Sequence, residues 1–210
     1  MGWIGGTYRG ACAGARVSVN RAGGDRRLEI LDLASQMFAR SGFHGTSMDD
    51  LGAAVGLSGP ALYRYFSGKE AILSEMLIDI SERLLEGGRE RVAANVDPRA
   101  RLDALVDFHV DFALDDPDLI DVQAREMDAM AEDDRRVVRR LQAQYVSLWV
   151  DTMRELWPGL TAESARSAAH AAFGLINSTP HSNRLTRPEM ATLLQGMALG
   201  ALAAAAQEES

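Results

Sequence analysis

Apolar residues recur every three to four positions along most of the chain, which is the spacing of one face of an α-helix. No stretch alternates between apolar and polar residues as a half-buried strand does, and the helix-forming residues Ala, Leu, Arg, Glu and Met dominate. Glycine and proline interrupt the pattern and so mark helix ends. We therefore expect an all-α protein of about nine helices, at residues 25–41, 47–55, 58–65, 69–91, 98–114, 117–130, 133–157, 161–178 and 187–207.

The first helix boundaries have specific chemical signals. Gly42 is expected to end the first helix as a C-terminal cap. Ser47 or Thr46 can begin the second helix, whose first turn is acidic. Ser58 can cap the third helix, and Pro60 is tolerated there because it lies in the first turn. These signals divide this part of the chain into short helices, whereas the later ones are longer.

The chain divides into three regions by composition. Residues 1–24 are glycine-rich and polar, with three arginines and no acidic residue. We expect a disordered extension there, with a basic arm that follows phosphate groups as the alternative. A small helical domain is then expected over residues 25–70, and a larger helical domain over residues 71–210.

The net charge of −8 is unevenly distributed. Residues 1–69 hold eight Arg or Lys and five Asp or Glu, a balance of +3, whereas the remainder holds 14 and 25, a balance of −11. A mildly basic head on an acidic body fits a protein that meets nucleic acid with one end only, although an imbalance of this size also arises by chance.

Cysteine content and hydropathy indicate the compartment. The one cysteine, Cys12, cannot form an internal disulfide. The apolar stretch 197–206 is interrupted by Gly200 and is shorter than the ~20 residues that span a bilayer. Residues 1–24 lack the continuous apolar core of a signal peptide. We expect a cytoplasmic protein with no membrane partner.

Two short helices joined by a tight glycine-containing turn, at residues 47–55 and 58–66, form a candidate helix-turn-helix motif. In this motif the second helix enters the major groove with its N-terminal end first. That end reads Ser58-Gly59-Pro60-Ala61, and its small residues allow the backbone to approach base edges. Ala61 can touch a thymine methyl group, and Arg64 can reach guanine or phosphate. Donors suited to phosphates are Thr46, Ser47, Tyr63, Tyr65 and Lys69.

These residues also have purely structural interpretations. Leu62 and Phe66 are expected to be core residues, and Ser47 and Ser58 can cap helices whether or not DNA is bound. Lys69 alone would be a solvated surface charge.

Residues 26–76 resemble the TetR family of bacterial regulators. The resemblance is carried by Arg27, Ile30, Leu31, Ala34, Met37, Phe38, Ala39, Gly42, Thr46-Ser47-Met48, Leu51-Gly52, Ala54-Val55-Gly56-Leu57-Ser58, Ala61-Leu62-Tyr63-Arg64-Tyr65-Phe66, Lys69-Glu70 and Leu73. It implies a DNA-binding head, a divergent ligand-binding body, dimerisation through the last two helices, palindromic operators and release of DNA on ligand binding. It further implies that phosphates are held by Thr46, Tyr65 and Lys69, and that Gly59, Pro60, Ala61, Tyr63 and Arg64 face the groove. Tyr65 stands where many members have histidine.

The larger domain shows no catalytic signature and no cluster of residues that predicts a metal site or a cofactor. An apolar ligand pocket with a few polar groups is expected there. Its candidate residues are Phe108, His109, Phe112, Arg125, Glu126, Met127, Met130, Tyr145, Trp149, Phe173 and Asn177. Aromatic residues at helical spacing can equally form plain core. Residues 173–181 resemble a helix end found in regulators of lipid or acyl-chain metabolism, which implies an apolar, acyl-type effector.

The last two expected helices are rich in small residues and methionine, which allow close approach between helices. We expect a two-fold dimer interface with Ala168, Ala172, Met190, Leu194, Met197 and Ala201. Packing onto the same chain is the alternative.

These patterns and the TetR resemblance together imply a ligand-responsive, DNA-binding transcriptional regulator, which we expect to be a homodimer that acts as a repressor and is not an enzyme. Its expected partners are double-stranded operator DNA, a second copy of itself and a small-molecule effector. One alternative is a helix-turn-helix protein that binds other proteins as an adaptor. A small helical enzyme using Glu126, Asp128 and His109 ranks far below, because no residue spacing supports it.

Overall fold

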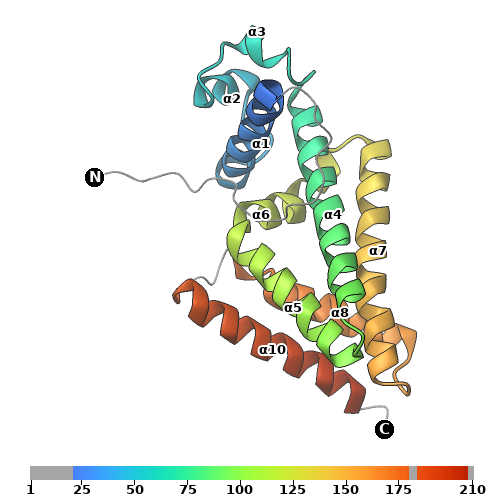
Figure 1. Cartoon of the computed structure of the whole chain (residues 1–210). Helices are drawn as coiled ribbons and strands as arrows, with labels where there is room; N and C mark the ends of the chain where they lie inside the picture. The colour runs from blue at the N-terminus through green and yellow to red at the C-terminus, as the bar shows by residue number, and fades with distance from the viewer. Residues whose placement is uncertain (1–20, 180–183, 208–210) are drawn as a thin grey trace. The chain divides into compact units, whose positions relative to one another are not determined.

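The chain was analysed as a computed structural model, which describes residues 21–179 and 184–207 (Figure 1). These residues form nine α-helices and one 3-10 helix and contain no strand, which confirms the expected all-α class. The chain divides into two compact units, with the division after Ile72. We call the described part of the first unit the head (residues 21–72) and that of the second the body (residues 73–207).

The head consists of α1 (Arg21–Ser41), α2 (Met48–Ala54), α3 (Gly59–Leu62) and the first residues of α4 (Lys69–Ala94). Helix α2 packs against both α1 and α3. The side chains buried between these elements are those of Ile30, Leu31, Ala34, Phe38, Phe43, Leu51, Val55, Leu62, Phe66 and Ile72. The motif is therefore built around an apolar core of its own.

Local capping chemistry sets the turns of the head. Gly42 follows α1 with a φ of 74°, in the left-handed region that favours glycine, as expected for its C-terminal cap. Ser47 and Asp50 form a capping box, in which the Ser47 hydroxyl accepts from the Asp50 N–H and the Asp50 carboxylate accepts from the Ser47 N–H. The hydrogen bonds from Ser47 lower the pKa of Asp50. The start of the motif is thus fixed by side chains of α2 itself.

Two helix boundaries in the head differ from expectation. Helix α1 begins at Arg21, so residues 21–24 are helical and do not belong to an extension; residues 1–20 lie outside the described part of the chain. Helix α3 ends at Leu62 instead of Tyr65, because the chain closes tight turns in which the Tyr65 N–H donates to Leu62 O. The Arg27 guanidinium donates to Tyr65 O and lies 4.1 Å from the Phe66 ring centroid. A contact from α1 therefore stabilises the turn that ends the motif.

The body contains the rest of α4, α5 (Pro98–Asp115), α6 (Pro117–Glu126), the 3-10 helix η1 (Met127–Ala129), α7 (Glu132–Leu156), α8 (Ala162–Ile176) and α10 (Arg187–Gln207). Helix α5 contacts α6, α7, α8 and α10, and its Phe108 ring lies against α4. The helix expected over residues 117–130 is observed only as far as Glu126, because the 3-10 helix η1 replaces its last turn.

Two adjacent glycines of α4 allow aromatic rings to approach its backbone. A Cβ atom on Gly87 would lie 2.2 Å from Cζ of Phe108, and one on Gly88 would lie 2.7 Å from Cε2 of Tyr145. Both distances are shorter than real Cβ contacts, so a larger residue requires the rings to move. The glycine pair thereby positions Tyr145 within the body.

Helix α10 is apolar over a longer stretch than expected. Residues Arg187–Ala206 have a mean hydropathy of 1.3 and are long and apolar enough to cross a membrane by length and composition, yet only 22% of the apolar window is buried in this chain. A single helix of this kind is weak evidence for a membrane span. An exposed apolar face of this length is typical of a surface that contacts another molecule.

Candidate nucleic-acid interface and ligand cavity

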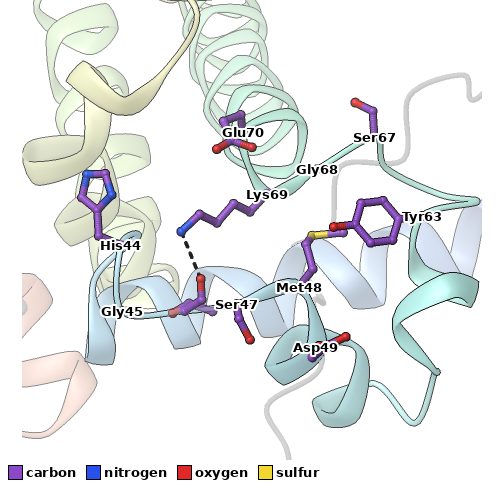
Figure 2. A pocket seen from close by; sticks show the side chains of 11 residues that line it. His44, Gly45, Ser47, Met48, Asp49, Tyr63, Ser67, Gly68, Lys69 and Glu70 are labelled. Atoms are coloured by element: carbon purple, nitrogen blue, oxygen red, sulfur yellow. Dashed lines mark hydrogen bonds between the residues drawn. The ribbon is translucent and has the colours of Figure 1, made fainter.

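An open concavity of about 600 Å³ lies on the head beside the helix-turn-helix motif (Figure 2). Its walls come from the loop before α2, the start of α2, the turn after α3 and the start of α4. The lining residues are His44, Gly45, Thr46, Ser47, Met48, Asp49, Tyr63, Ser67, Gly68, Lys69 and Glu70. Four of the residues expected to contact DNA, namely Thr46, Ser47, Tyr63 and Lys69, are thus brought to one surface.

Lys69 reaches across this concavity to the loop before α2, as Figure 2 shows. Its Nζ donates to the carbonyl oxygens of Phe43 (2.9 Å) and Thr46 (3.2 Å) and lies 4.4 Å from the Phe43 ring centroid. An ammonium group has three donors, so one remains for a phosphate oxygen. Lys69 therefore has a structural role that the sequence did not indicate, in addition to the expected charge.

Thr46, for which the resemblance implies a phosphate-holding role, makes a contact within the head. Its side chain is buried, and its hydroxyl donates to the Gly42 carbonyl at 3.0 Å. Ser47 remains exposed, although its hydroxyl lies 2.5 Å from the Asp50 carboxylate within the capping box. In the absence of DNA the Thr46 hydroxyl therefore holds the loop before α2, and its contact with a phosphate stays a prediction.

The leading turn of α3 is accessible. Ser58 and Pro60 are exposed and Gly59 and Ala61 are half-buried, so the backbone of this turn can be approached from outside. Ser58 stands at the N-cap position but its side chain makes no capping hydrogen bond, contrary to expectation. The turn presents few side-chain groups that could read bases.

Asp49 is a residue of this surface that sequence reasoning missed. It is exposed, and a Cβ atom on Gly59 would lie 2.3 Å from Asp49 Oδ1, which shows how closely the carboxylate approaches the start of α3. The missed signal was the acidic first turn of α2, which the sequence pattern assigned to helix capping alone. Asp49 adds a negative charge next to the leading turn.

The three residues after α3 have different environments. Tyr63 is 54% exposed and lines the concavity, and Arg64 is exposed. Tyr65 is half-buried, and its carbonyl accepts from Arg27. Tyr63 and Arg64 are therefore the long side chains of the motif that are most accessible to a partner.

The body contains a cavity of about 300 Å³. It is lined by Leu84, His109, Phe112, Ile120, Gln123, Ala124, Met127, Gln142 and Asn177. The sequence predicted His109, Phe112, Met127 and Asn177 and missed the other five residues. Of those, Ile120, Gln123 and Ala124 lie on α6, the helix on which the sequence predicted Arg125 and Glu126 as the pocket residues.

His109 links the cavity to an aromatic cluster. Its Nε2 lies 3.1 Å from Asn177 Oδ1 and its Nδ1 lies 3.3 Å from the Tyr145 hydroxyl. The imidazole centroid lies 4.8 Å from that of Phe173 and 6.0 Å from that of Trp149. Burial lowers the pKa of His109 to about 4, and burial also raises the pKa of Tyr145. Both groups are therefore neutral near pH 7.

Tyr145, Trp149 and Phe173 form a second layer behind His109 and do not line the cavity. The three rings contact one another, with centroids of Tyr145 and Phe173 at 5.8 Å and those of Trp149 and Phe173 at 4.8 Å. Trp149 is fully buried, and its ring lies edge-on to that of Tyr145, with centroids 6.2 Å apart. The expected pocket aromatics thus support the wall and do not form it.

Four expected pocket residues lie elsewhere, which is a correction. Phe108 packs against Gly87 and stacks with Arg91, whose Cζ lies 4.5 Å from its ring centroid. Arg125 is exposed and pairs with Asp121 one helical turn away. The remaining two, Glu126 and Met130, also lie outside the cavity lining. Helix α6 ends at Glu126, and the 3-10 helix η1 places Met127 at the cavity but not Met130.

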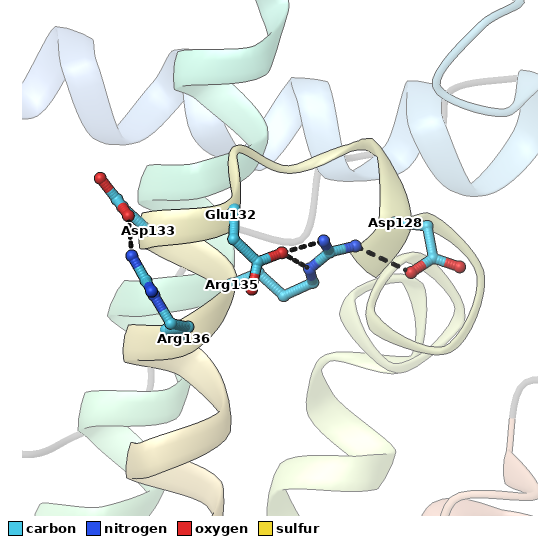
Figure 3. A network of polar contacts seen from close by, with 5 residues as sticks. All are labelled: Asp128, Glu132, Asp133, Arg135 and Arg136. Carbon is cyan, nitrogen blue, oxygen red and sulfur yellow. Dashed lines mark hydrogen bonds and ion pairs between the residues drawn. The ribbon is translucent and has the colours of Figure 1, made fainter.

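A polar network joins η1 to the first turn of α7 (Figure 3). Arg135 contacts Asp128 of η1 at 3.1 Å and also Glu132, and Arg136 pairs with Asp133. Asp128 of this network is 94% exposed, whereas His109, which the enzyme alternative would pair with it, is buried. Among the described residues, no group of three or more His, Cys, Asp or Glu could hold a metal ion.

The residues expected at a dimer interface divide into two groups. Ala172, Met190 and Leu194 are buried within their own chain, so they hold α8 and α10 in the body and cannot face a partner, and Ala168 is half-buried. Met197, with 49% exposure, and Ala201 remain accessible. After the exposed first turn of α10 (residues 187–189), the exposed residues recur at helical spacing and are Thr192, Leu193, Gly196, Met197, Gly200, Ala201 and Ala204.

Two family models match the chain. One, described as bacterial regulatory proteins of the tetR family, matches residues 30–76. The other, described as a tetracyclin repressor-like C-terminal domain, matches residues 95–181. The first match covers most of the head and extends four residues past the division after Ile72, and the second lies wholly in the body.

Known proteins resemble the chain over parts or most of its length. It is 31% identical over 135 residues to the HTH-type transcriptional repressor KstR2 of Rhodococcus jostii (strain RHA1), covering 64% of this chain and 63% of that protein. It is 34% identical over 88 residues to the HTH-type transcriptional activator FasR of Mycolicibacterium smegmatis, covering 42% of this chain and 40% of that protein. The chain thus matches less than two thirds of the length of these relatives.

A solved structure extends the similarity to most of the fold. A TetR-family transcriptional regulator from Bordetella parapertussis 12822 has a TM-score of 0.75 and 28% identity, covering 82% of this chain and 93% of that one. The two family models, the relatives and this fold agree with the resemblance carried by residues 26–76. The chain therefore belongs to the TetR family of bacterial regulators.

Proposed function

We propose that this protein is a cytoplasmic, ligand-responsive transcriptional repressor, which binds a palindromic operator as a homodimer and leaves it when a small, largely apolar effector enters the body. The observation that carries the proposal is the accessible leading turn of α3 next to the lined concavity of the head. The repressor sense follows the Rhodococcus relative, whose match is longer than that of the activator. The DNA contacts we propose are Thr46, Ser47, Ser58, Gly59, Pro60, Ala61, Tyr63, Arg64, Tyr65 and Lys69.

A route from effector to DNA is offered by α4. Leu84 lines the cavity and lies on α4, the same uninterrupted helix as Lys69. Lys69 is the first residue of α4, and its side chain is hydrogen-bonded to the loop before α2. An effector that displaces Leu84 therefore acts on a helix that contributes to both units. A coupling of about 1–3 kcal/mol is typical between two such sites. Release follows if the two recognition turns no longer match a half-site separation of ~34 Å.

The dimer is supported by the exposed apolar face of α10. Small residues along this face allow a second helix to approach closely. The exposed face of α8, formed by Arg166, Ser167, His170, Ala171 and Gly174, has the same helical spacing and also carries small residues. Two copies of these helices would form an isologous four-helix interface, which hides the apolar face and supplies the second half-site.

Replacing Met197 with glutamate is expected to yield monomers, because it places a charge at the centre of the exposed apolar face of α10. Size-exclusion chromatography with light scattering measures the mass directly. Val96→Glu is the matched control, since Val96 is 89% exposed and lies outside α10. A Met197→Glu protein that stays dimeric at the concentration of the wild type contradicts this interface.

The experiment that tests the proposed function is a titration of the protein with the duplex found upstream of its own gene and with a random duplex. We expect markedly tighter binding to the upstream duplex at physiological salt. Lys69→Met is expected to weaken binding to both duplexes and to lower the slope of log K against log salt by about 2 for the dimer, because one phosphate contact is lost in each protomer. Arg40→Met, which removes an exposed cation outside the concavity, is expected to leave the slope unchanged.

One observation favours the adaptor as a second candidate. The leading turn of α3 contains Gly59 and Pro60, which offer no side-chain group for reading bases, and Asp49 adds a negative charge beside it. Equal affinity for the upstream and random duplexes would support the adaptor and contradict the repressor.

A further inference from the structure

The polar groups of the body cavity are all uncharged and come from four different helices. Three side-chain amides line it: Gln123 from α6, Gln142 from α7 and Asn177 from the end of α8. The fourth polar residue is His109 of α5. The remaining lining residues are apolar: Leu84, Phe112, Ile120, Ala124 and Met127. None of the lining residues is an aspartate, glutamate, lysine or arginine.

The hydrogen bonds of His109 set the polarity at one end of the cavity. Because Asn177 Oδ1 can only accept, the proton of the neutral imidazole is on Nε2. Nδ1 then accepts from the Tyr145 hydroxyl. Asn177 lines the cavity, and its Nδ2 donates no hydrogen bond to another described residue, so two donors are available to a ligand. Within the described part of the chain, Gln123 and Gln142 make no hydrogen bond with other residues.

A charged ligand group has no counter-charge among these residues. Moving an ion from water into such a site costs far more than moving a carbonyl group that finds an amide donor. Burial keeps His109 neutral near pH 7, so it supplies no positive charge to a carboxylate either. The donors and the apolar wall together favour a molecule with an apolar body and one neutral acceptor.

We propose that the cavity takes an uncharged, mainly apolar effector that carries one carbonyl acceptor, such as a ketone, lactone, ester or thioester, and that it excludes the corresponding free acid and amine. The acceptor is bound by Asn177 Nδ2, with Gln123 and Gln142 as the alternative donors. This inference rests on the proposed function, in which the same cavity receives the effector, and it names the chemical class.

The test is calorimetric titration of the full-length protein without DNA at pH 7, using four probes with matched chains: nonan-2-one, nonanoate, nonylamine and nonane. We expect the ketone to bind about tenfold more tightly than nonane, from one hydrogen bond to an amide, and more tightly than either charged probe. Nonanoate or nonylamine binding as tightly as the ketone would overturn the inference. Failure of all four probes to bind would overturn it as well.

A variant locates the donor. Asn177→Leu keeps a side chain of similar size and is expected to remove the preference for the ketone over nonane while nonane still binds. If that variant does not fold, Gln142→Met and Gln123→Met serve the same purpose, and the side-chain amide NMR signals of the wild-type protein report which donor shifts on ketone binding. Asn95→Leu is the matched control, because Asn95 donates to Arg91 O outside the cavity. An unchanged preference for the ketone in all three cavity variants contradicts the assignment.

This experiment can fail separately from the proposed function. Operator affinity is measured on ligand-free protein and probe affinity on DNA-free protein. Operator binding with no preference for the ketone leaves a repressor with another class of effector. A preference for the ketone without operator binding leaves a ligand-binding protein that is not a repressor.

Discussion

Replacing Phe38 with alanine is expected to destabilise the head by about 3–5 kcal/mol and to abolish operator binding. Phe38 is fully buried, and its ring centroid lies 5.4 Å from that of Phe43. The Lys69 ammonium group in turn lies over the Phe43 ring. The lost ring leaves a cavity beneath the loop before α2. A unit of this size buries a small core, so a loss of this magnitude is a large part of its stability.

Hydrogen exchange measured by mass spectrometry checks this prediction, because it follows α1 and α2 separately from the body. Exchange in the head should accelerate strongly in Phe38→Ala, whereas exchange in α5 and α7 should match that of the wild type. Phe38→Leu keeps most of the apolar volume and is expected to cost less than about 1.5 kcal/mol. Equal exchange of α1 in Phe38→Ala and wild type would show that Phe38 does not stabilise the head.

The second large effect is a loss of stability in mild acid that originates in His109. This residue is buried, and burial lowers its pKa in the folded protein to about 4, from the ordinary histidine value of 6.5. Above pH 6.5 it is neutral in both the folded and the unfolded state. As the pH falls from 6.5 towards 4, the unfolded chain binds a proton that the folded protein excludes, so stability falls. The full loss is about 3 kcal/mol, of which about 2 kcal/mol is reached at pH 5.

Urea unfolding of the wild type and of His109→Gln between pH 7 and pH 5 measures this effect. The variant cannot titrate at this position, so the difference in unfolding free energy between the two proteins should change by about 2 kcal/mol over this range. Carboxylates titrate equally in both proteins and cancel in the difference. A difference that is constant with pH would mean that His109 is protonated as readily in the folded protein as in the unfolded chain.

Local sequence chemistry determined the fold class, most helix ends and the helix-turn-helix motif. The cap at Gly42, the capping box of Ser47 and Asp50 and the helix start at Pro98 each depend on a few neighbouring residues, and the structure has them where expected. The buried positions Leu62 and Phe66 also follow from helical spacing. These features could be predicted because the interactions that decide them lie within one turn of the chain.

Contacts between residues far apart in the sequence decided the rest. Thr46 is buried and Lys69 holds two loop carbonyls because α4 packs beside the loop before α2. The cavity is lined by Gln123 and Gln142, whose helices meet only in the folded body. Helical spacing shows which residues share a face of a helix, but the packing of the helices decides whether that face meets the core, a cavity or another chain.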